Sequence, residues 1–117
     1  AANIITILDK NKKTVPVSGQ DASVAGLQNV LLGKQTATVY KPFTLEATAA
    51  SELAIALLKG EKPTADKTLA DGTPYVAVTP VLVGPNEVKD VVAAGDATAA
   101  DICTAAVAAA CTKYGVA

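Results

Sequence analysis

Apolar residues fall at helical spacing over residues 4–8 and again over residues 24–31, where Gly33 ends the pattern. Two short runs, residues 14–17 and 36–40, carry β-branched side chains and therefore predict strands on either side of the second helix. The connections between these elements are tight. A strand, a helix and a second strand joined in this way predict a right-handed parallel crossover.

The pattern changes after the second predicted strand. The Lys-Pro pair at 41–42 predicts an extended corner, because proline fixes its own φ and restricts the residue before it. A long helix with one apolar stripe follows and stops at Gly60, and residues 61–74 predict a long polar surface loop. Residues 75–83 are extended and apolar with Pro80 inside the run, which predicts an edge strand or a strand that changes partners.

The remaining chain predicts helices. Residues 88–93 form a short helical pattern, and the Ala-rich stretch over residues 96–113 predicts one helix that Gly115 ends. The fold class is therefore α/β, a parallel sheet with flanking helices. Its few strands leave apolar faces that more chain would have to cover. The sequence also opens directly into helix-period residues without a Met, so we expect a piece of a longer protein.

Composition narrows the function. A chain of 117 residues allows one modest domain, and its 50% hydrophobic content is enough for a core. A net charge of -1 argues against a nucleic-acid partner. The absence of His removes the usual general base and the commonest metal ligand, so we expect no metal, no cofactor and no enzymatic activity.

Two charged residues occupy positions suited to a ligand. Gln20 and Asp21 follow a predicted parallel strand, and Lys41 ends the next one, so they are placed to share one edge of the sheet. A carboxylate that accepts hydroxyl protons and an ammonium that donates to hydroxyl oxygens suit a neutral polyol. Two simpler interpretations stay open: Asp21 (or Ser23) as the cap of the following helix, and Lys41 as a solvated surface lysine.

Cys103 and Cys111 allow two interpretations. In one continuous helix their Cα atoms would lie about 12 Å apart, beyond the ~7 Å that a disulfide spans. A bridge therefore requires an irregular stretch between them, whereas two reduced core thiols do not. An exported protein would favour the bridge, and we weakly favour it.

Three pieces of sequence together resemble a known family. They are the residues Val-Ser-Gly-Gln-Asp-Ala at 17–22, Thr-Val-Tyr-Lys-Pro at 38–42 and Leu-Leu-Lys-Gly-Glu-Lys-Pro at 57–63. With this spacing the chain resembles the C-terminal third of D-xylose-binding solute-binding proteins of ABC importers, in the ribose/galactose-type periplasmic binding protein class. The resemblance implies two Rossmann-like lobes, the type I fold of periplasmic binding proteins, with sugar bound between them. It matches Asp21 and Lys41 to sugar-binding positions.

The resemblance also implies a map of the chain and a set of partners. Residues 1–40 would belong to the C-terminal lobe, residues 41–76 to a crossover and helix of the N-terminal lobe, and residues 77–117 to the last crossover and C-terminal helices. The partners would be a monosaccharide, an ABC permease, and either the missing N-terminal portion of the receptor or a second copy of this fragment. The location would be periplasmic or extracellular, with a lipid anchor at the cell surface as one variant.

Two other classes of function stay open. A sugar-responsive transcription regulator can carry an effector-binding domain of this fold, but it would reside in the cytosol, where a disulfide is uncommon. An enzyme using Lys41 or a cysteine as nucleophile is the weakest of the three, because the sequence shows no partner base.

Overall fold

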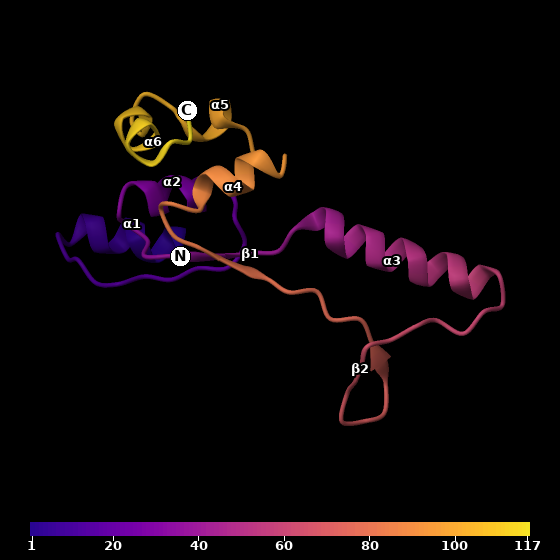
Figure 1. Ribbon diagram of the computed structural model, residues 1–117. Coiled ribbons are helices and arrows are strands. Elements are labelled where there is room, and N and C mark those ends of the chain that lie inside the picture. The colour runs from indigo at the N-terminus through magenta and orange to yellow at the C-terminus, as the bar shows by residue number, and fades with distance from the viewer. The chain divides into compact units, whose positions relative to one another are not determined.

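A computed structural model describes residues 1–117, which divide into two compact units (Figure 1). Unit 1 consists of residues 1–41 and 80–117, and unit 2 consists of residues 42–79. The α/β fold class predicted from the sequence is confirmed. The assignment of the segments to the lobes of a larger protein stays a prediction.

The first part of unit 1 contains α1 (Ala2–Lys10), α2 (Val24–Leu31) and β1 (Thr38–Tyr40). The chain before α2 runs parallel to the chain at β1: Ser18 bridges Ala37, and Gly19 N donates to Ala37 O at 3.0 Å. The predicted parallel crossover is therefore present. The predicted strand at 14–17 is wrong in its position, since the pairing starts only at Val17, whose carbonyl accepts from Thr36 N.

A further strand, β4 (Val81–Val83), pairs with β1 in antiparallel register, with Thr38 opposite Val83 and Tyr40 opposite Val81. This antiparallel neighbour was not predicted. The hypothesis of a strand that changes partners is confirmed, because Tyr75 pairs with Lys67 in unit 2 while Val81 pairs within unit 1.

The C-terminal part of unit 1 is helical but interrupted. The helix α4 (Val88–Ala93) has the predicted bounds. The single helix predicted over residues 96–113 is wrong: α5 (Ala99–Ile102) and α6 (Ala108–Tyr114) are separate. The break brings the Cα atoms of Cys103 and Cys111 to 5.9 Å and allows the disulfide between them, which a continuous helix would prevent.

Unit 1 has a hydrophobic core, and α2 lies at its centre, in contact with α1, β1, α5 and α6. The core side chains come from α2, β1, β4 and the C-terminal helical part: Leu27, Val30, Leu31, Tyr40, Val83, Val88, Val91, Ile102, Val107, Cys111 and Val116. The sheet and helices of unit 1 are thus held by burial of apolar surface.

Unit 2 contains α3 (Phe43–Leu58) and a hairpin of β2 (Lys67–Thr68) and β3 (Pro74–Tyr75), paired antiparallel. The loop predicted over residues 61–74 therefore has structure of its own. Gly72, at φ 88, closes the turn, and its N–H donates to Leu69 O at 3.0 Å. None of the residues of α3 is buried, although the helix is rich in apolar side chains.

Candidate functional site

Asp21 and Lys41 come together in unit 1. Lys41 Nζ lies 2.9 Å from Asp21 Oδ1, in an ion pair that joins the turn before α2 to the end of β1. The side chains are 38% exposed for Lys41 and 66% exposed for Asp21. The pairing places a hydrogen-bond donor and an acceptor side by side. It is not an important support of the fold, because ion pairs at this exposure contribute little to stability.

Asp21 does not cap the helix that follows it. Ser23 is the N-cap of α2, and its Oγ accepts from Gly26 N at 3.2 Å. Asp21 instead adopts the left-handed region at φ 67, and its backbone carbonyl accepts a hydrogen bond from Thr38 Oγ1 at 2.9 Å. The capping interpretation of Asp21 is therefore wrong, and its carboxylate is oriented toward Lys41.

Gln20, the third predicted site residue, lies in the same turn as Asp21 and is exposed. The Gly-Gln-Asp turn thus follows the residues that pair in parallel with β1, at the carboxyl end of that short ladder. Ligands of open α/β sheets bind outside the carboxyl ends of the strands, so all three residues are in a position to contact one.

The residue before Lys41 is anchored in the core. Tyr40 is buried, and its hydroxyl donates a hydrogen bond to Asp96 Oδ2 in the loop between α4 and α5. Burial, followed by this hydrogen bond and the negative charge of Asp96, raises the pKa of Tyr40 to about 12. Tyr40 therefore keeps its proton at neutral pH and holds the end of β1, where Lys41 begins.

Sequence reasoning missed Thr38 and Asp96 as supports of this site. A signal for Thr38 was available, because Thr38 and Tyr40 alternate with Val39 and so share the buried face of a predicted strand. A threonine on a buried face requires a hydrogen-bond partner. No comparable signal identified Asp96, which is far from Tyr40 in the sequence.

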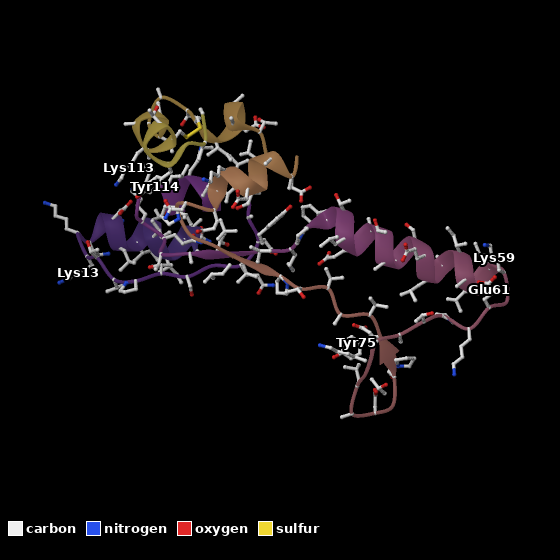
Figure 2. The ribbon with its side chains drawn as sticks, viewed as in Figure 1. Lys13, Lys59, Glu61, Tyr75, Lys113 and Tyr114 are labelled. Carbon is white, nitrogen blue, oxygen red and sulfur yellow. A yellow bond between two sulfur atoms is a disulfide. The ribbon has the colours of Figure 1, made fainter.

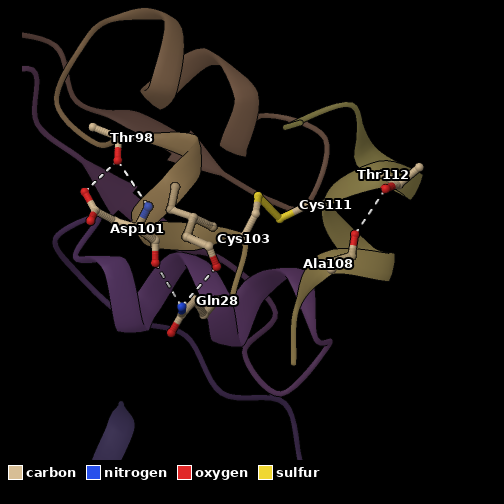
Figure 3. The surroundings of a disulfide bond; sticks show 8 residues. Gln28, Thr98, Asp101, Cys103, Ala108, Cys111 and Thr112 are labelled. Carbon is tan, nitrogen blue, oxygen red and sulfur yellow. Dashed lines mark hydrogen bonds between the residues drawn. A yellow bond between two sulfur atoms is a disulfide. The ribbon is translucent and has the colours of Figure 1, made fainter. Parts of the chain in front are cut away.

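A disulfide joins Cys103, at the end of α5, to Cys111 in α6 (Figure 3). Beside it, Gln28 Nε2 of α2 donates to Ile102 O at 3.0 Å and so satisfies a carbonyl at the end of α5. Thr98 caps the start of that helix by accepting from Asp101 N at 3.1 Å. The surroundings of the bridge are structural and contain no cluster suited to chemistry.

Unit 2 contains a hollow of about 580 Å³, with Leu53, Leu57, Pro63 and Tyr75 in its lining. Figure 2 labels Tyr75, which lies in the hairpin. Apolar side chains dominate the hollow, and it has no paired donor and acceptor like those of unit 1. We therefore do not place the polar site there.

The structure contains neither a cluster of metal ligands nor a membrane-spanning helix. No three His, Cys, Asp or Glu side chains lie close enough together to hold a metal ion. None of the helices combines the length and the apolar character needed to cross a membrane.

The sequence is similar to two characterised proteins, and no protein-family model matches it. It is 47% identical over 81 residues to a D-xylose-binding periplasmic protein of Escherichia coli (strain K12), and 38% identical over 81 residues to one of Haemophilus influenzae. Each match covers 67% of this chain and 24% of the relative. The chain thus spans about a quarter of the length of the relatives it matches.

Solved structures show the same fold. A carbohydrate transporter solute-binding protein from Chloroflexus aurantiacus, in complex with D-glucose, superposes with a TM-score of 0.68 at 31% identity, covering 73% of this chain and 26% of that one. An ABC transporter solute-binding protein from Clostridium phytofermentans with bound β-D-glucose gives a TM-score of 0.77 over 85% of this chain and 33% of that one; at 23% identity it supports the fold alone.

Proposed function

Since this chain belongs to the family of sugar solute-binding proteins of ABC transporters, we propose that it supplies one side of a monosaccharide-binding site in an extracytoplasmic receptor. The observation that carries the proposal is the ion pair of Asp21 with Lys41, at the carboxyl end of parallel-paired chain segments and exposed to solvent. Two charged groups of opposite sign, already side by side, offer a sugar both kinds of hydrogen-bond partner.

In this site each residue has its own role. The Asp21 carboxylate accepts hydrogen bonds from two sugar hydroxyls, and Lys41 Nζ donates to a hydroxyl or ring oxygen. Gln20, with an amide that both donates and accepts, contacts a further hydroxyl from the same turn. When the sugar enters, its hydroxyls replace water around the two charges, while the charges themselves keep a partner of opposite sign.

The sugar is D-xylose or a closely similar monosaccharide, and the receptor delivers it to an ABC permease for import. The two relatives with the higher sequence identity are named for D-xylose, whereas the two structural neighbours hold glucose. Because the pyranose rings of these sugars differ only by a hydroxymethyl group, one carboxylate and one ammonium can serve either of them.

In this proposal, unit 2 packs against a part of the receptor that lies outside this chain. The assignment of residues 41–76 to the N-terminal lobe requires such a contact. The helix α3 of unit 2 buries no residue, and the chain spans only about a quarter of its relatives. The apolar residues of α3 lie around its circumference rather than on the single stripe predicted from the sequence, and such a helix is normally surrounded by protein. A second copy of this fragment is the alternative occupant.

The location follows from the disulfide and the relatives. The bridge between Cys103 and Cys111 fits an oxidising compartment, and both curated relatives are periplasmic proteins. The same bridge argues against the sugar-responsive regulator of the cytosol. We therefore propose a binding protein, with no enzymatic role, on the outer side of the cytoplasmic membrane.

The test is calorimetric titration of the full-length receptor with D-xylose, D-glucose and D-ribose. Asp21→Ala or Lys41→Ala should weaken binding roughly 10- to 200-fold, because each removes a charge-assisted hydrogen bond in a desolvated site. Lys59→Ala and Lys62→Ala are the matched controls. They remove exposed lysines of unit 2 and should change the affinity by less than about twofold.

Circular dichroism and urea unfolding of each variant separate a loss of binding from a loss of folding. Wild-type affinity in a folded Asp21→Ala receptor would reject the proposed site. Binding of D-ribose as tight as that of D-xylose would reject the proposed sugar but leave the site in place.

A further inference from the structure

Asp21 is tied to the core of unit 1 by a buried hydroxyl. Thr38 Oγ1 donates to the backbone carbonyl oxygen of Asp21 at 2.9 Å, and Thr38 is 1% exposed. From this contact we infer that Thr38 is a positioning residue for the sugar site. It holds the backbone of Asp21 in the conformation from which the carboxylate reaches Lys41. The inference rests on the proposed function and adds to it a residue that touches no ligand.

The backbone of Asp21 needs such a support. At φ 67 it lies in the left-handed region, which L-residues adopt at a cost of roughly 1–2 kcal/mol unless they are glycine. Asp is among the residues that tolerate the region best, yet the conformation persists only where the surroundings fix it. The side chain of Asp21 is exposed and its ion pair with Lys41 contributes little to stability, so the buried hydrogen bond to its backbone is the stronger restraint.

A second buried polar side chain lies against the other end of the same turn and shares a hydrogen-bond acceptor with it. Gly19 N and Gln35 Nε2 both donate to Ala37 O at 3.0 Å, and Gln35 is 2% exposed. A Cβ atom added at Gly19 would lie 2.5 Å from Gln35 Nε2, so a side chain there would require the buried Gln35 amide to shift. The turn from Gly19 to Asp21 is therefore fixed at both ends by residues in or just before β1.

This arrangement explains how a surface turn presents a carboxylate with a defined direction. Without the Thr38 hydroxyl, the carboxylate remains but its backbone is free to leave the left-handed region. The sugar then has to order the turn on binding, and that conformational cost reduces the affinity. The expected loss is that of one neutral hydrogen bond, about 3- to 10-fold in affinity.

The experiment uses the full-length receptor and titration with D-xylose. Thr38→Val keeps the shape of the side chain and removes the hydroxyl, so it should weaken binding about 3- to 10-fold. Thr38→Ser restores the hydroxyl and should bring the affinity back to within about twofold of wild type. Thr112→Val is the matched control, because it removes an exposed hydroxyl that donates to Ala108 O in α6.

The decisive measurement is the double variant with Asp21→Ala. If Thr38 acts through Asp21, Thr38→Val should have no further effect on affinity once the carboxylate is gone. A merely structural role would instead lower stability and weaken binding equally in both backgrounds, and that result would overturn the inference. Thr38→Ala, which opens a small space as well, serves as a second variant with the same expected pattern.

The two proposals fail in different ways. Weakened binding in Asp21→Ala together with wild-type binding in a folded Thr38→Val receptor would overturn the inference and leave the proposed function intact. Wild-type binding in Asp21→Ala would reject the proposed site, and the role of Thr38 in sugar binding with it.

Discussion

Residues 1–41 and 80–117 contain every buried hydrophobic side chain of the chain, whereas residues 42–79 contain none. The two units do not differ in the supply of apolar residues. Unit 2 has exposed side chains as large as those in the core of unit 1, among them Phe43, Leu45, Ile55 and Leu58. The two units differ in the packing partners available to each helix. In unit 1, segments far apart in the sequence pack around α2, while α3 has no such neighbours in its own unit.

The difference shows that a regular helix is no evidence of a core. The prediction of α3 rested on its apolar residues and on the glycine that follows its end, and both are local features of the sequence. Burial requires a second surface. We therefore expect unit 1 to carry the stability of this chain and unit 2 to depend on an outside surface, and three experiments on the 117-residue chain compare the two directly.

The largest effect is expected from truncating one leucine in each unit. Leu27→Ala removes a side chain that is 0% exposed and should lower the free energy of unfolding by about 2–5 kcal/mol. Leu58→Ala removes a side chain that is 88% exposed and should change it by less than about 0.5 kcal/mol. Urea unfolding followed by circular dichroism measures both. Equal losses in the two variants would mean that α3 is buried in solution, for example against a second copy of the chain.

A smaller effect is expected from the disulfide, which belongs to unit 1. Cys103→Ala/Cys111→Ala opens a short loop and should lower the free energy of unfolding by about 2–3 kcal/mol, since the unfolded chain gains conformational freedom. Amide hydrogen exchange read residue by residue shows where the loss falls. Faster exchange in α5 and α6 with unchanged exchange in α3 is expected, and faster exchange confined to α3 would contradict the comparison.

The smallest effect concerns Tyr40 at high pH. Its pKa is raised to about 12, so between pH 10 and 12 the unfolded chain loses a proton that the folded chain keeps. The stability that this tyrosine contributes is complete below pH 10 and falls by about 1–2 kcal/mol as the pH rises toward 12. The measurement is urea unfolding of wild type and Tyr40→Phe across this range.

The difference between the wild type and Tyr40→Phe should shrink as the pH rises, because the variant has no hydroxyl to ionise. Tyr75→Phe, which removes a tyrosine hydroxyl of unit 2, is the matched control. A difference that stays constant from pH 9 to 12 would show that the Tyr40 hydroxyl is not held in the core.

Most elements were predictable because their signals are local. The helix over 88–93 has its predicted bounds, and the glycines at 33, 60 and 115 lie just beyond helix ends with the positive φ that glycine allows. The interruption of the helix predicted over 96–113 could not be foreseen from composition. The alanines of this segment favour helix throughout, and the break at Cys103 reflects the bridge and the burial of Val107 in the core.

The candidate site also has one part that the sequence predicts and one part that only the structure shows. The positions of Asp21 and Lys41 after successive parallel segments predict that both lie at one edge of the sheet, and in the structure Lys41 Nζ lies 2.9 Å from Asp21 Oδ1. Their role in sugar binding stays a prediction. The sequence left the cap of α2 open between Asp21 and Ser23, because both side chains can accept from the first turn of a helix. The structure decides it: Ser23 Oγ accepts from Gly26 N, whereas the Asp21 carboxylate pairs with Lys41.

By itself, the sequence determined the α/β class, the family and the candidate pair, because these depend on residue order, spacing and chemical type. Only the tertiary structure decided the antiparallel pairing of β4 with β1, the anchoring of Tyr40 by Asp96 and the holding of Asp21 by Thr38. Each of these joins segments that are separated along the chain. Their energies depend on distance and burial in the folded state, and no local pattern of side chains records either quantity.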